Sequence, residues 1–286
     1  MMMIFITGST GYLGSAIQTE LLASGIDVVA QARSAQQAAS LEARGATAAT
    51  GDLRDRRWLA DQLSSADGMI HAASPNDATS EALDTAVIDA VLDAFSGSDR
   101  PYVHTAGAWI HGSGPHITED TPMAPPPMVA WRPAIVARVR DAADRGVRSC
   151  VISPANLYGH AGGLPALLAA GPVTDGDEPA LMFPGRAQHF GNVFVEDVAR
   201  LYRLAVLSAP PGSYFLAASA SAPTIDQVAS AASRLGDLDG RVTPEPETQT
   251  RARLGPLAEP PAAGPADRCF TGQEARLAAI WPLAAR

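Results

Sequence analysis

The chain contains no lysine, so all 21 of its basic residues are arginine, against 30 acidic residues in 286 positions. Any mechanism that depends on a lysine ammonium group is therefore excluded. The net charge of −9 and the scattered arginines argue against a nucleic-acid partner, because neutralising phosphates requires clustered positive charge. The densest basic run, Arg54, Arg56 and Arg57, is typical of a solvated loop or the start of a helix.

Cysteine is almost as scarce, with only Cys150 and Cys269. Cys150 lies in an apolar run and is expected to be a small buried side chain, so we expect no disulfide and a cytoplasmic protein. No stretch reaches the roughly 18 apolar residues of a membrane span, and Met1–Thr7 show no features of a secretory signal. No His, Asp and Glu residues have metal-ligand spacing, so no metal is expected.

Short apolar runs alternate with amphipathic stretches through the first half of the chain, which predicts right-handed βαβ units and a parallel sheet. The expected strands are Met3–Thr7, Asp27–Ala32, Thr47–Thr50, Gly68–Ala72, Tyr102–Thr105 and Ser149–Ser153. The expected helices are Leu13–Ala23, Ala35–Ala43, Arg57–Leu63, Ser80–Phe95 and Pro133–Asp144.

The second half is less regular. Gly159–Gly185 is expected to be a loop that carries a short helix. Beyond it the pattern predicts strands at Asn192–Val195 and Ser213–Ala217, and helices at Glu196–Ser208 and Thr224–Leu235. Residues 236–268 hold many prolines and glycines, and no element is predicted there.

The strongest motif follows the first expected strand and opens the first expected helix. Thr7–Gly14 read TGSTGYLG, which is the pattern TGxxGxxG. Gly8 permits a tight turn, Gly11 lets the backbone approach a pyrophosphate, and Gly14 allows close packing of helix on strand. The free N–H groups and the dipole of the helix then bind phosphate. We therefore expect a dinucleotide at this turn, bound by Thr7, Gly8, Thr10, Gly11, Tyr12, Leu13 and Gly14.

The end of the second strand distinguishes between the two nicotinamide dinucleotides. An acidic residue there binds the ribose 2′-hydroxyl of NAD, but this strand ends in Arg33 and Ser34 without a carboxylate. A guanidinium and a hydroxyl suit a 2′-phosphate, which predicts NADPH as the cofactor, NADP being preferred over NAD. The alternative is that Arg33 faces solvent or stacks on the adenine.

Taken together, these motifs resemble the short-chain dehydrogenase/reductase superfamily in its extended or atypical branch, which includes NAD-dependent epimerases and dehydratases. The matching segments are Thr7–Gly14, Ala32–Ser34, Gly51–Leu53, Ile70–Ala73, Pro154–Gly159 and Val193–Ala199. The resemblance implies that Asp52 and Leu53 contact the adenine, and that Ala72, Ala73 and Ser74 line the path to the nicotinamide. It also implies that Pro154, Asn156 and Leu157 border the nicotinamide and the substrate.

The fold expected from this resemblance is α/β, a Rossmann-type doubly wound parallel sheet with a small C-terminal substrate-binding lobe. The Rossmann domain is expected to comprise residues 1–155 together with a strand and helix near 190–208. The lobe is expected to comprise residues 156–189 and 209–286.

The chain departs from the resemblance at its reactive centre. Reductases of the superfamily use a Ser or Thr after the fifth strand and a YxxxK helix, but here the helix reads Val129–Val136 without tyrosine, and lysine is absent. Thr105 is a candidate for the hydroxyl position, with Ala106 and Gly107 as equally good alignments. Loss of one donor to a developing oxyanion slows a reaction by roughly 10²–10³-fold, so another proton donor is needed.

Three sources of that donor remain open: another side chain, ordered water, or a phenol on the substrate beside its own ketone. The expected catalytic side chains are Thr105, Ser113 and Tyr158, and the expected substrate contacts are Trp109, His111, Tyr158, His189 and Phe190. His111, His116 and His189 are further candidate donors. The aromatic residues, Trp131 and Phe194 among them, could equally belong to the core.

The sequence therefore predicts an NADPH-dependent ketoreductase acting on a small, polyketide-like aromatic ketone, as a monomer or homodimer with no nucleic-acid or membrane partner. The composition and the missing triad resemble actinobacterial tailoring ketoreductases of aromatic polyketides, of the simocyclinone angucyclinone type. A second hypothesis is a redox-inactive regulator that senses NADP(H). A non-reductive epimerase, dehydratase or cyclase ranks third, because no acid–base pair of carboxylates is evident.

Overall fold

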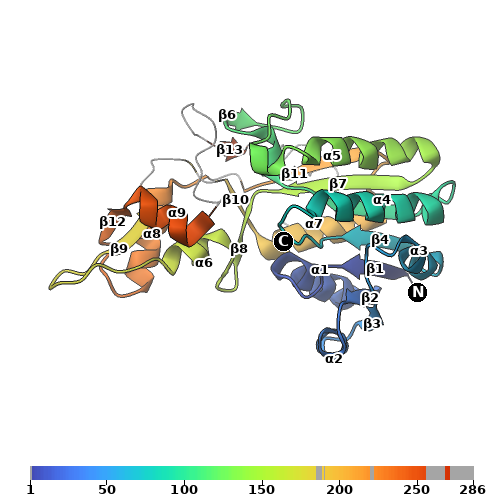
Figure 1. Cartoon of the computed structure of the whole chain (residues 1–286), viewed down its shortest axis with the longest axis horizontal. Coiled ribbons are helices and arrows are strands. Elements are labelled where there is room, and N and C mark those ends of the chain that lie inside the picture. The colour runs from blue at the N-terminus through green and yellow to red at the C-terminus, as the bar shows by residue number, and fades with distance from the viewer. Residues whose placement is uncertain (1, 185–188, 190, 220–221, 256–267, 271–286) are drawn as a thin grey trace.

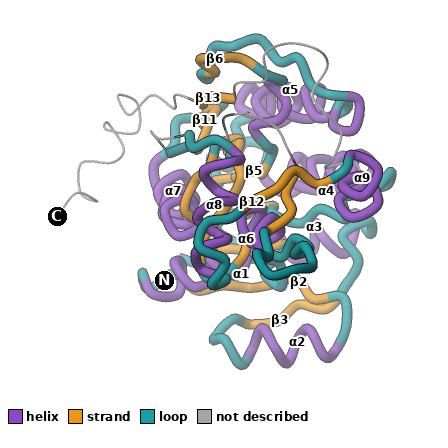
Figure 2. The backbone as a smooth tube through the Cα atoms, turned by 90° about the vertical axis from the view of Figure 1, so that its left-hand side faces the viewer, coloured by secondary structure: helices purple, strands orange, loops and turns teal. Residues whose placement is uncertain are grey.

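The computed structural model describes residues 2–184, 189, 191–219, 222–255 and 268–270. Figure 1 shows a parallel sheet flanked by helices on the right and a smaller group of helices and short strands on the left. Figure 2, turned by 90°, places α6, α8 and α9 of this smaller part at the front. The predicted Rossmann-type α/β fold with a small additional lobe is confirmed.

The central sheet has seven strands in the order β11-β7-β5-β4-β1-β2-β3, and every neighbouring pair is parallel. Its strands are β1 (Met3–Thr7), β2 (Asp27–Ala32), β3 (Thr47–Thr50), β4 (Gly68–His71), β5 (Pro101–Thr105), β7 (Arg148–Pro154) and β11 (Ser213–Ala217). The strand order reverses between β1 and β4, and a crevice outside the carboxyl ends of the strands is where such sheets bind ligands.

Alternating side chains of the strands pack into two separate cores, which is why the central strands are mostly apolar. Ile4 and Ile6 of β1 contact one core, and Phe5 contacts the other. The first core lies under α1 (Tyr12–Ala23), α2 (Ala35–Glu42) and α7 (Val195–Ser208), the second under α3 (Arg56–Ser64), α4 (Ser80–Phe95) and α5 (Arg132–Asp141). Helices on both faces make the sheet doubly wound.

The smaller lobe is built from segments that follow β7. Its helices and strands include α6 (Gly163–Ala169), β9 (Leu181–Pro184), α8 (Ile225–Leu235), β12 (Val242–Glu245) and α9 (Glu247–Leu254). β9 and β12 form a parallel pair, and α8 contacts α6 and both strands. Thr224 caps α8 through a capping box with Gln227.

Short elements connect the sheet to the lobe. β8 (Asn156–Gly159) pairs in parallel with β10 (Asn192–Phe194), and β6 (Gly114–Ile117) pairs with β13 (Arg268–Phe270). The 3₁₀ helices are η1 (Ala108–His111), η2 (Pro127–Val129) and η3 (Ala142–Arg145). No helix in the part of the chain that the structure describes is long and apolar enough to cross a membrane.

One predicted domain boundary is wrong. Residues 209–286 were expected to lie in the lobe, but β11 is the edge strand of the central sheet, with Ser213–Ala217 paired along Cys150–Pro154 of β7. Phe215 and Leu216 are buried in the first core, so this segment belongs to the sheet for the same reason as the earlier strands. β12 and α9 lie within 236–268, where the sequence pattern gave no clear element.

Candidate functional site

A cavity of about 370 Å³ opens at the carboxyl edge of the sheet, beside the point where the strand order reverses between β1 and β4. Loops after β1, β2, β3 and β4 form its walls. The residues that line it are Gly8, Thr10, Gly11, Gln31, Arg33, Gln37, Asp52, Leu53, Arg54, Ala72, Ala73, Ser74, Pro75 and Leu83. Most of them come from the four segments that the sequence motifs singled out for a dinucleotide.

Five residues of this wall were not predicted from the sequence: Gln31, Gln37, Arg54, Pro75 and Leu83. Arg54 was interpreted as a solvated residue, although it stands two positions after Asp52 and shares its loop. Gln37 lies one turn into α2, and that position could have been inferred from the helix period. Leu83 comes from α4, and no local pattern links that helix to the site.

The glycine turn has no room for side chains. Gly8 has φ +79°, and a Cβ there would lie 2.5 Å from the carbonyl oxygen of Ala72. A Cβ on Gly14 would lie 2.1 Å from the carbonyl oxygen of Gly8. Gly11 is the N-cap residue of α1, and no side chain caps the helix there. The first backbone N–H groups of α1 are therefore left for another acceptor. This turn fits a pyrophosphate, as predicted.

Replacing Gly14 by alanine is expected to lower the free energy of unfolding by about 3 kcal/mol or more, because the new methyl group meets backbone that cannot move aside. Urea unfolding followed by circular dichroism measures this. Gly236→Ala is the control, because a Cβ there lies at an ordinary 3.6 Å from the carbonyl oxygen of Ala232. Equal stability of the two variants would contradict the tight contact.

The end of β2 presents Arg33 to the cavity. Its backbone N–H donates to Oε1 of Gln37 over 2.8 Å, while the Ser34 hydroxyl accepts the N–H of Gln37 and caps α2. The Arg33 side chain is exposed, and it has no ion pair among the described residues. Arg54 lies on the same cavity wall, with its guanidinium 3.8 Å from Asp52 and 3.0 Å from the Thr79 hydroxyl.

The remaining predicted cofactor contacts lie outside this cavity. They are Thr7, Tyr12, Leu13, Gly14, Ser34, Thr105, Pro154, Asn156 and Leu157. Thr7 is buried directly behind the glycine turn, and Tyr12 turns its hydroxyl to the carbonyl of Gly159 over 2.6 Å. Asn156 donates to the carbonyl of Gly191 over 2.8 Å.

The three predicted catalytic side chains stand apart. Thr105, at the end of β5, shares a 2.6 Å hydrogen bond with the hydroxyl of Tyr202 on α7. Ser113 is exposed in the loop after η1, and Tyr158 is 36% exposed with its ring 5.5 Å from that of Phe194. No hydrogen bond among the described residues joins these three to one another.

The predicted substrate contacts have different surroundings. His111 is buried, and its ring nitrogens lie 2.9 Å from the Thr121 carbonyl and 2.7 Å from the Tyr214 hydroxyl. His189 has Nδ1 2.7 Å from the Ala222 carbonyl, and Trp109 is half-buried in η1. Phe190 lies outside the described residues. A substrate role for these residues stays a prediction.

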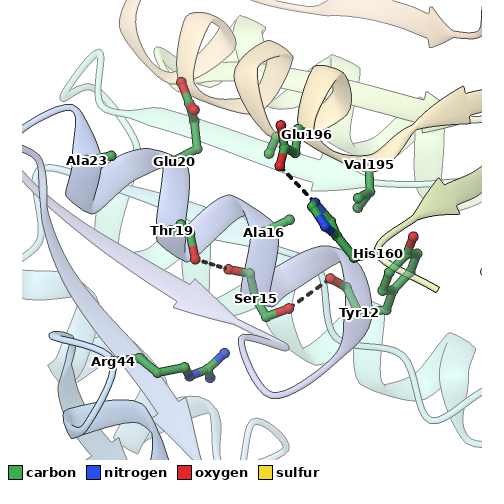
Figure 3. A pocket seen from close by; sticks show the side chains of 11 residues that line it. Tyr12, Ser15, Ala16, Thr19, Glu20, Ala23, Arg44, His160, Val195 and Glu196 are labelled. Carbon is green, nitrogen blue, oxygen red and sulfur yellow. Dashed lines mark hydrogen bonds and ion pairs between the residues drawn. The ribbon is translucent and has the colours of Figure 1, made fainter. Parts of the chain in front are cut away.

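A second, larger cavity of about 590 Å³ lies on the other side of α1 (Figure 3). One face of α1 lines it, together with Arg44, His160 and the start of α7. Its polar groups already have partners within the protein: His160 contacts Glu196 over 2.8 Å, and Arg44 donates to the carbonyl of Ser9 over 2.9 Å. The first cavity, with its free guanidinium and uncapped helix, is therefore the better candidate for a cofactor.

Behind the cofactor cavity lies a buried polar cluster, formed by Thr7, His71, Asp84, His104 and Tyr102. Burial alone would raise the pKa of Asp84, but the imidazole groups of His104 and His71 outweigh it and hold that pKa well below its usual range. Burial lowers the pKa of His104, against the opposing pull of the Asp84 carboxylate. The cluster therefore keeps a carboxylate charge inside the protein.

This cluster predicts that stability falls with acid. As the pH drops through about 6.5, His104 takes up a proton in the unfolded chain but not in the folded one, so the free energy of unfolding falls by up to about 1.4 kcal/mol per pH unit. Below about pH 4, Asp84 adds a second loss in the same direction. The groups that face His104 are Tyr102, His71 on β4, Asp84 on α4 and Arg132 on α5.

Urea unfolding at several pH values between 5 and 8 measures this slope in the wild type and in His104→Gln. The slope should decrease in His104→Gln and persist in His116→Gln, which changes an exposed histidine. An identical slope in all three proteins would show that His104 does not cause the pH dependence of stability.

Among the described residues, no three His, Cys, Asp or Glu side chains form a group that could hold a metal ion.

Comparison with known proteins shows the family to which this chain belongs. The profile of the NAD dependent epimerase/dehydratase family matches residues 4–217. An uncharacterized protein of Schizosaccharomyces pombe is 32% identical over 163 residues, which are 55% of each chain. A 4-hydroxy-2-methyl-3-oxo-4-farnesyl-3,4-dihydroquinoline-1-oxide ketoreductase of Stigmatella aurantiaca is 38% identical over 73 residues, 26% of this chain and 22% of that one. The chain thus spans about half or less of the length of the curated relatives it matches.

Solved structures share the fold across nearly the whole chain. The UDP-glucose 4-epimerase of Thermus thermophilus, in complex with NAD, has a TM-score of 0.75 and 19% identity, covering 98% of this chain and 94% of its own. At that identity the likeness concerns the fold alone.

Proposed function

Because the chain belongs to the NAD dependent epimerase/dehydratase family, we propose that it is an NADPH-dependent ketoreductase, which reduces a small, aromatic, polyketide-like ketone to a secondary alcohol. One observation carries the choice of cofactor. Arg33 lines the cofactor cavity without an ion-pair partner among the described residues, and β2 ends there without a carboxylate. A free guanidinium suits the 2′-phosphate that distinguishes NADPH from NADH.

The residues present fit each part of such a cofactor. The glycine turn and the uncapped start of α1 would hold the pyrophosphate, Leu53 and Asp52 would contact the adenine, and Arg33 would bind the 2′-phosphate. Bound NADPH would supply the hydride for the reduction of the ketone. The protein would bind and orient the two reactants against each other, and orientation is a large part of catalysis.

The proton for the new alcohol needs a source other than the missing tyrosine–lysine pair. The Thr105 hydroxyl is one candidate donor. It lies at the carboxyl end of β5, two strands from β1, and it is hydrogen-bonded to the hydroxyl of Tyr202. If Tyr202 donates to Thr105, the Thr105 hydrogen is free to be donated to a carbonyl oxygen. A phenol on the substrate or an ordered water would complete the transfer.

Support for the substrate class is of two kinds. One relative of the chain carries the name of a ketoreductase of a 3-oxo-dihydroquinoline-1-oxide, and aromatic side chains, Tyr158 and Phe194, pack against each other where β8 pairs with β10. We further propose a cytoplasmic monomer or homodimer without nucleic-acid or membrane partners, in line with its net charge of −9.

The test mixes the purified protein with NADPH and an aromatic ketone that carries a hydroxyl group peri to the carbonyl, and follows the absorbance of the reduced nicotinamide. NADPH consumption with formation of the alcohol is expected, and the same ketone without the hydroxyl should react more slowly. Binding of NADPH without turnover of either ketone, or of a panel of other ketones, would contradict the reductase and favour a regulator that senses NADP(H).

A further inference from the structure

The buried cluster behind the cavity forms a continuous chain of contacts across three strands and a helix. Thr7 Oγ1 lies 2.7 Å from Nδ1 of His71, and Nε2 of His71 lies 3.0 Å from Oδ1 of Asp84. The other oxygen, Oδ2, lies 3.6 Å from Nε2 of His104, whose Nδ1 is 2.9 Å from the Tyr102 hydroxyl. All five residues have solvent exposures of 3% or less.

These contacts define where the protons lie. A carboxylate only accepts hydrogen bonds, so His71 must donate Nε2–H to Asp84, and His104 turns its Nε2–H toward the other oxygen. With the proton on Nε2, a neutral His104 ring has a lone pair on Nδ1 that accepts from the Tyr102 hydroxyl. In the same way Nδ1 of His71 can accept from the Thr7 hydroxyl. The Thr7 oxygen in turn accepts the backbone N–H of Ala72 over 3.3 Å.

Each inner member of the cluster is next in sequence to a residue of the proposed site. Thr7 precedes Gly8, His71 precedes Ala72, and Asp84 follows Leu83, and all three neighbours line the cofactor cavity. His104 precedes Thr105, the proposed proton donor. Three of the four segments, from β1, β4 and β5, are neighbouring strands of the sheet, with Thr7 paired to His71 and His71 to His104, and Asp84 joins these strands to α4.

The tightest of these junctions shows why their spacing matters. The carbonyl of Ala72 would be 2.5 Å from a Cβ on Gly8, so the backbones of the two turns are in direct contact. The hydrogen bonds from Thr7 to His71 and from Ala72 to Thr7 cross this junction. A small shift of His71 would therefore move both walls of the pyrophosphate turn.

Asp84 is the centre of the cluster, because among the described residues its carboxylate is the group that has polar contacts with both imidazoles. Arg132, at the start of α5, interacts electrostatically with both Asp84 and His104. A buried carboxylate is costly unless it is paired. Stability alone would be served as well by apolar side chains, so the charge needs another explanation.

We propose that Asp84 is a positioning residue of the cofactor site: it holds His71 and His104 in their Nε2–H forms and so fixes the spacing of Gly8, Ala72 and Thr105. The proposal rests on the proposed function only for the identity of the ligand. Replacing Asp84 by asparagine presents an amide N–H to one imidazole, which must then switch its proton to Nδ1 or lose the contact.

The experiment compares the full-length wild type, Asp84→Asn and Tyr102→Phe. Tyr102→Phe removes the hydroxyl at the end of the chain of contacts and leaves Asp84 between its two imidazoles. Amide hydrogen exchange is measured first, without any cofactor. In Asp84→Asn, exchange of the segments around Gly8, Ala72 and Thr105 is expected to rise at least about tenfold above the change in Tyr102→Phe. Nitrogen-15 spectra of the histidine rings should show Nε2–H on both imidazoles in the wild type and a changed tautomer in Asp84→Asn.

The dissociation constant of NADPH is measured second, well below each variant's melting temperature. It is expected to rise about tenfold in Asp84→Asn and to stay within about twofold of wild type in Tyr102→Phe. Should Asp84→Asn not fold, Thr7→Val breaks the cluster at the turn itself and is expected to give the same changes around Gly8 and Ala72.

Equal exchange and equal affinity in Asp84→Asn and Tyr102→Phe would overturn the proposal, because both would then act through general stability. Failure of the wild type to bind NADPH would instead overturn the proposed function. The exchange and nitrogen-15 data would still decide the role of Asp84.

Discussion

Replacing Arg33 by glutamate is expected to raise the dissociation constant of NADPH at least about 100-fold, or about 2.7 kcal/mol, and to leave that of NADH within about threefold. A guanidinium on a 2′-phosphate forms charge-assisted hydrogen bonds, worth roughly 1.5–3 kcal/mol each, and a carboxylate in its place repels the phosphate. NADH has no phosphate there, so its binding to the glycine turn is unaffected. Fluorescence titration of each dinucleotide measures both constants.

The matched control is Arg57→Glu, which makes the same change of charge at an exposed arginine of α3 that does not line the cavity. Its affinity for NADPH should fall by less than about threefold, the effect of net charge alone. Equal losses of NADPH affinity in the two variants, or equal losses of NADPH and NADH affinity in Arg33→Glu, would remove Arg33 from the phosphate site. Arg54 would then be the next arginine to test, since it lies on the same wall.

Replacing Thr105 by valine is expected to lower kcat by about 10²–10³-fold, the usual effect of losing one donor to a developing oxyanion, while KM changes less than about threefold. Valine keeps the shape of threonine and removes only its hydroxyl. Tyr202→Phe should lower kcat by about tenfold, because the Thr105 hydroxyl then loses the partner that orients it. Steady-state kinetics with the hydroxylated ketone and NADPH measure both.

Thr47→Val serves as control, since it makes the same change at an exposed threonine on β3, the far edge strand of the sheet. Its kcat should equal that of the wild type. A Thr105→Val enzyme with unchanged kcat would show that the proton comes from water or from the substrate alone. A tenfold rise in KM with unchanged kcat would instead make Thr105 a binding residue.

Local pattern was sufficient for most of the sheet. β1, β2, β3 and β11 have the predicted bounds. For β1, which is buried on both faces, a continuous apolar run is needed whatever the strand pairs with. β12 and α9 were missed, since Val242–Glu245 contains a proline and few apolar residues. That strand exists through its pairing with β9, a tertiary contact that the local sequence does not encode.

The residues of the site likewise fall into those that a local motif predicts and those that only the tertiary structure reveals. Arg33 and the glycine turn could be found because a motif fixes their place relative to a strand end. Asp84 could not, because α4 carries four acidic residues, and the local sequence gives no sign that two histidines from different strands will meet this one. His104 lies within the predicted strand Tyr102–Thr105, and the structure adds the carboxylate that its ring faces.

Isothermal titration calorimetry of the wild-type chain with NADPH and with NADH tests the central claim most directly. We expect one site per chain, with NADPH bound at least about tenfold more tightly than NADH, because only NADPH offers a 2′-phosphate to Arg33. Absence of binding heat with either dinucleotide at several temperatures, or equal affinity for both, would contradict it.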